Sequence, residues 1–532
     1  MKNRILFIAI LCVMFVVFVT ACGNKDNTDN DGMTKSALDN LNDSGFPIVD
    51  DDITLKMFTV KSNQSIKVDW NDLLVWNEYE EMTNINLDWI EQVSGDTLEE
   101  KRNLALSGGN MPDVFFAAQF PNSDILKHGE QGVFLRLNDL IDDYAPNLKK
   151  MMEEDPNIEK GLTFPDGNIY SLPDISDNDF LSIQLGARPW IDEEWLDQLG
   201  MGPPETTDEF YEFLIAVKES DDSMVPYSGV NMDNFIDWIK GAFGLNNVGG
   251  GQVDLDPDGD DLRFIATSEE YREMLEYIHT LYDEKLIEQN IFSIEWDQFM
   301  ANAGDGKYAA TMFYDPKTTF GGKGEDFISL SALEGPNGDK MYTGVQPPLS
   351  NIAQFIITDQ NPNPAATMRW IDYFYSEEGA KLMYMGVEGE SYVEKDGELK
   401  YVDDIENANN REQAIAEHVP WLGVGPPGLV TADVFDGSET SDESLESADK
   451  IRPYIPEEIW GGFTYTNEEN KFMNATGSDI EKYVEEMRDK FISGDEKLSD
   501  DNWNKYLDSI EDMGLEEYMD IQEEAYERYQ SQ

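Results

Sequence analysis

The sequence predicts an α/β fold whose second half is richer in helix, and two observations carry this prediction. Between residues 53 and 118, short apolar stretches with strand-like alternation take turns with stretches of helical spacing. Strand, helix, strand, helix, strand is the signature of a parallel sheet with crossover helices. Beyond residue 200, several longer segments have helical periodicity and few strands separate them. With 532 residues, the chain is long enough for two to four domains or lobes.

The N-terminus precedes the predicted fold and has the composition of an export signal. The basic start MKNR is followed by an uncharged apolar run and by Val19-Thr20-Ala21-Cys22. The run is too short for a good membrane-spanning helix, for which roughly 20 apolar residues are wanted. The four residues resemble the bacterial lipobox, in which the signal is cut before the cysteine and the thiol is lipidated. The resemblance implies a signal peptide at 1–21 and lipidation of Cys22; the alternative is an uncleaved anchor helix.

Composition is consistent with an exported globular protein. Removing residues 1–21 also removes Cys12, so Cys22 would be the only thiol and the mature chain would have no disulfide. A chain of this length can bury its own core without disulfides. The net charge of −70 becomes −72 once Lys2 and Arg4 leave, because no acidic residue leaves with them. Such a charge argues against electrostatic attraction to nucleic acid or to an anionic membrane surface.

Residues 22–52 are predicted to form a disordered tether, because they are rich in Asp and Asn and poor in large apolar residues. As a flexible coil, about 30 residues have a root-mean-square reach on the order of 30 Å. Two acyl chains on one cysteine would hold the protein at the membrane stably, since burial contributes roughly 0.8 kcal/mol per methylene.

The predicted elements of the body follow the tether in chain order. Strands are expected at 53–60, 85–92 and 111–118, with helices between them at 70–85 and 97–109. Later helices are expected at 208–221, 269–287, 363–385, 478–494 and 502–529. The tryptophans predicted to pack in the core, because they sit at helical spacing among apolar neighbours, are Trp70, Trp76, Trp195, Trp238 and Trp370.

Linked segments along most of the chain resemble one family. SGGNMPDVFFA is similar to the SG-x-x-PD-apolar start of a strand in the extracellular solute-binding proteins, family 1, which deliver carbohydrates to ABC importers. Further similar segments are FLRLNDLIDDYAPNL, FPDGNIYSLP, EEWLDQLGMGPPETTDEFYEFL and PAATMRWIDYFYSEEGAKLMYMGVEGESYVEKDGELKY. The C-terminal EEMRDKFISGDEKLSDDNWNKYLDSIEDMGLEEYMDIQEEAYERY resembles the long Gram-positive lipoprotein branch of the family. The resemblance covers roughly residues 53–532.

The resemblance implies a two-lobed, maltose-binding-like clamp of the periplasmic-binding-protein type II class, with a helical C-terminal extension. Such clamps close on a sugar by bending at a few hinge residues where the chain crosses between lobes. The crossings would lie near Leu172, around 335–345 and near residue 400. The implied lobes are 53–172 with about 337–400, and 173–336 with about 401–532.

A sugar site needs carboxylates, amides and arginine for the hydroxyl edge of the ligand and aromatic rings for its apolar faces. By position in the family fold, the resemblance implies a set of ligand-binding candidates near the cleft. They are Gln119, Phe120, Arg188, Trp190, Tyr314, Asp315, Trp421 and Trp460. Core packing is the alternative for the aromatic candidates, because an aromatic ring in an α/β lobe is more often buried.

The acidic stretch DLDPDGDDL at 254–262 matches the first half of a calcium-binding EF-hand loop. Its calcium candidates are Asp254, Asp256, Asp258 and Asp260. The second half of the pattern fails, because the twelfth position is Ile265 instead of Glu. We therefore predict a hairpin turn and no metal or cofactor, with a calcium site as the alternative.

The chain has few features of an enzyme. Its histidines lie far apart and outside any HExxH or triad-like motif, and it has no G-x-S-x-G sequence. A glycosidase needs only two carboxylates at the right separation, and 108 acidic residues make pairs of that kind uninformative. We therefore predict no enzymatic activity, and a glycosidase stays as an alternative.

Together with the N-terminal signal, the family resemblance implies a surface lipoprotein that captures a carbohydrate, an oligosaccharide in particular, and hands it to ABC permease subunits. A ligand that bridges both lobes only in the closed state would shift the population toward closure, without covalent chemistry. We expect a monomer, lipid-anchored on the extracellular face of the cell membrane, that binds no nucleic acid. The alternative is an adhesin-like lipoprotein that docks on polysaccharide without transport.

Overall fold

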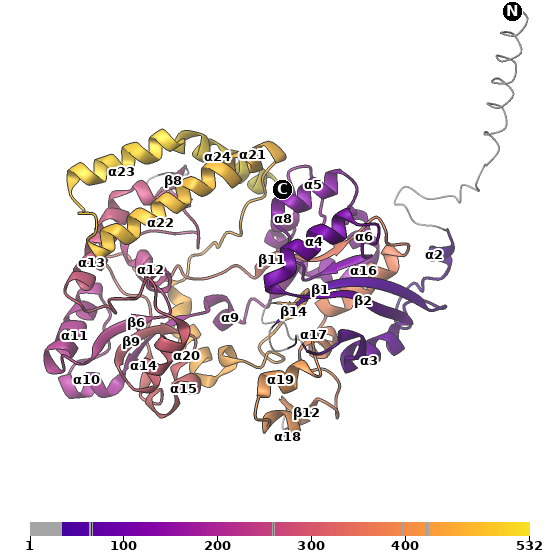
Figure 1. Ribbon diagram of the computed structural model, residues 1–532, viewed down its shortest axis with the longest axis horizontal. Coiled ribbons are helices and arrows are strands. Elements are labelled where there is room, and N and C mark those ends of the chain that lie inside the picture. Colours follow the sequence, from indigo (N-terminus) through magenta and orange to yellow (C-terminus); the bar gives the residue numbers. More distant parts are fainter. Residues whose placement is uncertain are drawn as a thin grey trace, which may run out of the picture.

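A computed structural model describes residues 35–62, 65, 67–257, 259, 261–395, 397–420 and 425–532. Two lobes lie side by side, each with its own sheet and core, and helix α9 (Leu181–Leu185) lies between them (Figure 1). Across the described residues, no helix combines the length and the apolar character needed to cross a membrane.

The first lobe is built on a six-stranded mixed sheet. Its strands are β1 (Ile53–Lys61), β2 (Ile85–Ser94), β3 (Val114–Phe116), β4 (Leu172–Ser176), β11 (Leu349–Ile357) and β14 (Gly428–Val430), in the order β14-β4-β11-β3-β1-β2. β1 runs parallel to both β2 and β3, and β11 runs antiparallel to β3 and β4. The parallel arrangement of the first three strands confirms the alternation of strands and helices predicted for residues 53–118.

Helices and a small hairpin complete the first lobe. The helices are α2 (Lys35–Asp39), α3 (Leu74–Thr83), α4 (Leu98–Ser107), α5 (Asn122–Glu130), α6 (Asn138–Tyr144), α7 (Pro146–Glu154), α8 (Pro156–Leu162), α16 (Pro364–Asp372), α17 (Glu377–Tyr384), α18 (Asp403–Glu406) and α19 (Arg411–Ala416), and the hairpin strands are β12 (Tyr392–Lys395) and β13 (Glu398–Tyr401). Trp70, Trp76 and Trp370 are buried here, as predicted, and the Trp76 ring lies 6.1 Å from Trp70 and 5.8 Å from Trp370. These rings fill the space between the sheet and α16.

The second lobe has a four-stranded sheet in the order β10-β5-β9-β6. Its strands are β5 (Arg188–Asp192), β6 (Val225–Gly229), β9 (Tyr308–Phe313) and β10 (Phe327–Ser329), with a separate hairpin of β7 (Val253–Leu255) and β8 (Leu262–Phe264). Its helices are α9, α10 (Glu193–Leu199), α11 (Thr207–Ser220), α12 (Met232–Ile239), α13 (Glu269–Asp283), α14 (Trp296–Gly304), α15 (Pro316–Thr319) and α20 (Asp442–Ile451). Trp238 is buried and Trp195 is partly buried in this core, as predicted.

The C-terminal extension is helical, as predicted, and packs on the second lobe. It contains α21 (Asn467–Phe472), α22 (Ser478–Ser493), α23 (Asp500–Met513) and α24 (Leu515–Ser531), drawn in yellow in Figure 1. α22 lies along α13, and α24 lies against β8. The start of the extension also reaches the first lobe, where the Thr464 hydroxyl donates a hydrogen bond of 3.0 Å to the Thr163 carbonyl. The extension therefore touches both lobes.

Local sequence signals explain where many of these helices begin and end. The hydroxyl of Thr206 accepts a hydrogen bond from the Glu209 amide at the start of α11, and Ser268 does the same for Tyr271 at the start of α13. Gly514 has φ of 112°, a left-handed conformation that favours glycine, and it separates α23 from α24.

The chain passes between the two cores at three places. Phe180 is the last buried residue of the first core before the first passage, and Leu181 is the first buried residue of the second. The chain returns between Val345 and Leu349, and its last buried residue in the first core is Val434. These segments form the first, second and third crossings.

The third crossing lies later than the sequence analysis predicted, which placed it near residue 400. Tyr401, Ile405 and Ile415 are buried in the core of the first lobe, and β14 pairs with β4 of the same sheet. The polar segment 403–411 has no strand pattern that would mark it as part of the first lobe. That the chain after it returns to the first sheet as β14 is visible only in the tertiary structure.

The second half of the predicted tether is ordered, which corrects the expectation that residues 22–52 are disordered. Ile48 and Val49 are each 1% exposed and belong to the core of the first lobe. The Ile48 amide donates a hydrogen bond to the Thr83 carbonyl at the end of α3, and the Arg369 guanidinium donates to the Gly45 carbonyl at 2.8 Å. A short apolar stretch inside a polar one was enough to dock this segment. Residues 1–34, with the signal peptide and Cys22, lie outside the described residues.

Candidate functional site

A cavity of about 880 Å³ lies where the chain crosses between the lobes. It is lined by Asp174, Ser176, Ile183, Gln184, Thr318, Gln346, Pro347, Tyr384, Tyr401, Arg411, Glu412, Ile415, Gly425, Val430, Phe435, Asp436, Gly437, Ser438 and Glu439. The lining therefore combines β4 and β14 of the first sheet, α9 of the second lobe, α19, and the segments that cross between lobes. A volume of this size is in the range of small-molecule sites, which are about 300–1,000 Å³.

Three aromatic residues, Tyr384, Tyr401 and Phe435, line the cavity. The Tyr401 hydroxyl donates a hydrogen bond of 2.6 Å to the Tyr384 carbonyl, which fixes the β13 end against α17. The Phe435 ring lies 6.1 Å from the Tyr384 ring and 5.8 Å from Phe180. Burial raises the pKa of Tyr384 and of Tyr401, so both phenols are neutral at physiological pH. Such rings offer apolar faces on which the C–H patches of a sugar can pack.

Arg411, at the start of α19, is the basic group of the cavity. Its Nη2 lies 2.9 Å from Glu406 Oε1, its Nε donates to Glu406 Oε2 at 3.2 Å, and Nη2 also contacts the Asp436 carboxylate. The guanidinium lies 5.5 Å from the centre of the Tyr401 ring. Burial by itself would lower the pKa of Arg411, but Glu406 and Asp436 outweigh that effect and raise it. Arg411 is therefore a permanent cation held in place by two carboxylates.

Acidic and amide groups supply the remaining polar lining. Asp174, at 9% exposure, lies so close to the chain at Gly425 that a Cβ there would be 2.1 Å from Asp174 Oδ2. Glycine is needed at this position because any side chain would displace the carboxylate. The Gln184 side-chain amide donates to the Asp177 carbonyl at 3.2 Å, while the backbone carbonyl of Gln184 accepts from the Gln346 backbone amide at 2.9 Å. Gln184 thus ties the first crossing to the second.

Arg188, predicted from the family resemblance as a ligand contact, lies behind the cavity wall. It is fully buried, and its Nη1 donates to the Ser182 carbonyl at 2.6 Å. Its Nη2 donates to the Tyr314 carbonyl at 2.7 Å and to the Ser444 hydroxyl at 2.9 Å. Ser444 in turn donates to the carbonyl of Ser438, which lines the cavity. In this arrangement Arg188 joins α9, the end of β9 and α20.

Three further candidates lie near Arg188 in the second lobe. Asp315 is fully buried, accepts a hydrogen bond of 2.7 Å from the Ser441 hydroxyl, and caps α15. Trp190 is 1% exposed and its Nε1 donates to the Phe313 carbonyl at 2.9 Å, so it packs in the core. Tyr314 is 38% exposed. None of the three is among the lining residues, although Thr318, at the end of α15, is.

Two candidates of the first lobe lie on the loop after β3. The Arg102 guanidinium lies 4.7 Å from the centre of the Phe120 ring and donates to the Ala118 carbonyl at 3.0 Å. Phe120 is buried, whereas Gln119 is exposed and has φ of 51°. A positive φ at a residue other than glycine is uncommon and costs conformational energy. Neither residue lines the cavity.

The remaining two aromatic candidates lie elsewhere. Trp460 is 7% exposed and packs against Tyr526 of α24, with ring centroids 4.7 Å apart and the ring planes tilted by 36°. It therefore fastens the C-terminal extension to the second lobe. Trp421 belongs to residues 421–424, which lie outside the described part of the chain.

Sequence reasoning missed the residues that do line the cavity, notably Arg411, Glu412, Asp436 and Tyr401. They belong to the stretch 401–439, which was assigned to the other lobe and has no clear periodicity. The available signal was Arg411 itself, a lone basic residue in the polar run IENANNREQ.

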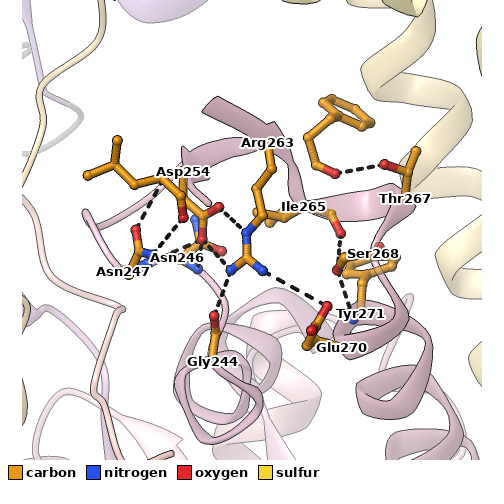
Figure 2. Close-up of polar contacts among 12 residues, drawn as sticks. Gly244, Asn246, Asn247, Asp254, Arg263, Ile265, Thr267, Ser268, Glu270 and Tyr271 are labelled. Carbon is orange, nitrogen blue, oxygen red and sulfur yellow. Dashed lines mark hydrogen bonds and ion pairs between the residues drawn. The ribbon is translucent and has the colours of Figure 1, made fainter. Parts of the chain in front are cut away.

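At the acidic stretch 254–262, where a calcium site is the alternative to the predicted hairpin turn, an arginine contacts the first acidic residue, Asp254 (Figure 2). The Asp254 side chain is fully buried and accepts from Arg263 Nε at 2.6 Å and Nη2 at 3.0 Å, and from the Asn246 amide at 2.7 Å. Arg263 also donates to the Gly244 carbonyl at 2.7 Å. The Arg263 guanidinium therefore occupies the Asp254 carboxylate and balances its charge.

The hairpin predicted around this loop is present as β7 and β8, which pair antiparallel. Two of the calcium candidates, Asp258 and Asp260, lie outside the described residues. Within the described part of the chain, no group of three or more His, Cys, Asp or Glu side chains is placed to hold a metal ion.

Comparison with known proteins places this geometry in context. The family model of the bacterial extracellular solute-binding proteins matches residues 70–381. The fructooligosaccharide ABC transporter substrate-binding protein FusA of Streptococcus pneumoniae is 27% identical, over 98% of each chain. The polygalacturonan/rhamnogalacturonan-binding protein YtcQ of Bacillus subtilis is 24% identical, over 85% of this chain and 87% of YtcQ. The structure of FusA in complex with kestose has a TM-score of 0.71 at 26% identity, covering 90% of this chain and 100% of FusA.

Proposed function

This chain belongs to the bacterial extracellular solute-binding proteins, and from that membership we propose that its interlobe cavity captures an oligosaccharide for an ABC importer. The chain has the two-lobed type II fold of these proteins, as predicted, and it is a carbohydrate-binding, substrate-binding protein and not an enzyme. Its relative FusA, named for fructooligosaccharide, matches it from end to end.

The observation that carries the choice of this cavity is its position at the crossings. Ser176, Gln346 and Asp436 each line it, and they belong to or border the first, second and third crossing. A ligand held there touches the segments whose bending moves one lobe against the other. Contacts that improve on closure would shift the population toward the closed state. An importer that recognises the closed state would then accept only loaded protein.

The chemistry of the lining suits a sugar. The carboxylates of Asp174, Glu412 and Glu439 can accept hydrogen bonds from hydroxyl groups, and Arg411 can donate them. The rings of Tyr384 and Phe435 supply apolar surface for the faces of the sugar. Relatives differ in the charge of the glycans they are named for, since fructooligosaccharides are neutral and polygalacturonan is acidic.

The protein works on the extracellular side of the cell membrane, as its family does. We further propose that lipid on Cys22 anchors it there and that it acts as a monomer. Because the body is ordered from residue 35, the connecting segment of the lipidated chain would be 23–34, shorter than the tether first predicted. Mass spectrometry of the detergent-extracted protein tests the anchor, and a Cys22→Ser variant should be released from the membrane.

Binding of purified 23–532 to a panel of oligosaccharides tests the cavity. A ligand at 100 times its dissociation constant should raise the free energy of unfolding by roughly 2.7 kcal/mol, which a thermal-shift assay detects. Small-angle scattering should show a smaller radius of gyration with the ligand. Weak binding to long polymers without this compaction would support the adhesin-like alternative instead.

Matched variants of α19 and the residue after it locate the ligand. Both side chains are exposed, but Glu412 lines the cavity and Glu417 lies outside the lining. Glu412→Gln should weaken glycan binding at least fivefold, because a charged acceptor becomes a neutral one. Glu417→Gln should bind as wild type. Equal affinity of the two variants and the wild type would place the ligand elsewhere.

A further inference from the structure

We propose that the cavity selects uncharged oligosaccharides over acidic ones such as uronates, and that Asp436 sets this selectivity by occupying Arg411. This inference rests on the proposed function, because it concerns the substrate class of the same cavity. It separates two classes of glycan that family membership leaves open.

The lining has an excess of negative charge. It contains four carboxylates, those of Asp174, Glu412, Asp436 and Glu439, and in its described part a single basic side chain, that of Arg411. Four negative charges and one positive charge leave a formal charge of −3. The carboxylates come from three segments that line the cavity, namely β4, α19 and the third crossing. An anionic ligand would therefore meet like charge from more than one segment.

The basic group is already used within the protein. A uronate is bound most strongly by an arginine that donates two parallel hydrogen bonds to it. In Arg411, Nε and Nη2 make such a pair of contacts with Glu406, at 3.2 and 2.9 Å, and Nη2 also contacts Asp436. Arg411 with its two partners has a net charge of −1. The guanidinium therefore neutralises protein carboxylates and leaves none of its charge for a ligand.

The nearest basic side chain on the lining loop of the second lobe is also paired. Lys317 precedes the lining residue Thr318, and its Nζ lies 2.9 Å from Glu443 Oε1. A neutral sugar needs no cation here, because its hydroxyl groups donate to the carboxylates, and hydrogen bonds to a charged acceptor are the stronger kind. The same carboxylates that favour hydroxyl groups repel a uronate, and the partly buried site screens that repulsion less than bulk water does.

A matched pair of ligands tests the charge selectivity. The neutral ligand is the trisaccharide that binds best among kestose, maltotriose, cellotriose and xylotriose. Isothermal titration compares it with its derivative oxidised to a uronate at one primary hydroxyl. Xylotriose has no primary hydroxyl, so its acidic partner is a glucuronic acid-substituted xylotriose. At 50 mM NaCl, we expect the acidic derivative to bind at least tenfold more weakly. At 500 mM NaCl this difference should shrink, because salt screens charge repulsion, while the affinity of the neutral ligand stays constant.

A matched pair of variants tests the role of Asp436. Asp436→Asn removes one partner of Arg411, and Asp433→Asn removes a neighbouring exposed carboxylate outside the lining. The ratio of the acidic to the neutral dissociation constant should fall at least fivefold in Asp436→Asn and stay at the wild-type value in Asp433→Asn. Glu412→Gln lowers the charge without touching the ion pair, and it should lower the same ratio even where Asp436→Asn fails to fold.

The outcomes separate this inference from the proposed function. Acidic and neutral ligands that bind within twofold of each other, at low and at high salt, would overturn the selectivity. An unchanged ratio in folded Asp436→Asn and in Glu412→Gln would overturn the role of the lining charges. If neither neutral nor acidic glycans bind at all, the proposed function itself is wrong.

Discussion

Replacing Arg188 by methionine should destabilise the second lobe and weaken glycan binding together. The guanidinium is fully buried and donates to the Ser182 and Tyr314 carbonyls and to the Ser444 hydroxyl. Methionine keeps much of the volume but donates nothing, so both carbonyls lose a charged donor. Ser444 keeps its own hydrogen bond to Ser438.

The size of the effect follows from these contacts. Each buried acceptor left without a partner costs about 1–3 kcal/mol, which gives about 2–6 kcal/mol for the two carbonyls. Part of this is recovered, because the variant no longer buries a charge. Burial lowers the pKa of Arg188, which means that the charged form is held at a cost. We expect a net loss of about 3 kcal/mol in the free energy of unfolding, and about half of that for Arg188→Lys, which keeps the charge and part of the donor set.

Urea unfolding followed by circular dichroism measures the stability, and titration with the best oligosaccharide of the panel measures binding. Two lobes can unfold in separate transitions, so the loss should fall on one of them. Arg136→Met is the control, because that arginine is exposed, with 52% of its side chain accessible, and it should change stability by less than about 0.5 kcal/mol. Wild-type stability and wild-type affinity in Arg188→Met would refute the role assigned to Arg188 behind the cavity wall.

Three further predictions concern other parts of the chain. Burial raises the pKa of the Asp372 carboxyl to about 6 from an ordinary 3.8, so the folded protein binds this proton more tightly than the unfolded chain does. The protonated carboxyl therefore stabilises the fold fully below pH 3.8, and this contribution of about 3 kcal/mol is lost as the pH rises through about 6. Urea unfolding from pH 4 to 7 should show a correspondingly flatter pH dependence for Asp372→Asn. Gly425→Ala should weaken glycan binding at least tenfold in titration calorimetry, because its Cβ would displace Asp174, and an unchanged affinity would remove that carboxylate from the site. Arg263→Gln should lower the free energy of unfolding by about 3–5 kcal/mol, measured by thermal unfolding, because the buried Asp254 carboxylate loses its cation. Treatment of the wild type with a calcium chelator should leave the melting temperature unchanged.

Much of the fold was predictable because local signals point the same way as tertiary packing. The strand at 53–60 and the helix at 74–83 show their periodicity within a few residues, and the helix starts at 206 and 268 have capping residues. The resemblance to the solute-binding family, confirmed by the family match, led to the two-lobed architecture and the general function. Neither the architecture nor the general function required knowledge of which loops contact each other in the folded protein.

The site was much less predictable, because it is made by contacts between distant parts of the chain. Arg188 and Ser444 are 256 residues apart in sequence, and only the folded crossings bring them within 2.9 Å. Trp190 and Trp460 are aromatic residues that could have faced a sugar equally well by sequence, but packing buries them. Periodicity shows which residues share a face of an element, and it contains no information on which faces then meet.

The sequence by itself determined the α/β class, the helical C-terminal extension, the strongly acidic surface and the family, because these depend on composition, periodicity and linked motifs. The tertiary structure decided that residues 35–52 are ordered, that the third crossing follows residue 434, and that Arg411 with its carboxylates forms the cavity. The physical reason is that burial and charge pairing depend on three-dimensional neighbours. The same arginine would be a solvated surface group in one loop arrangement and is the cation of a cavity lining in another.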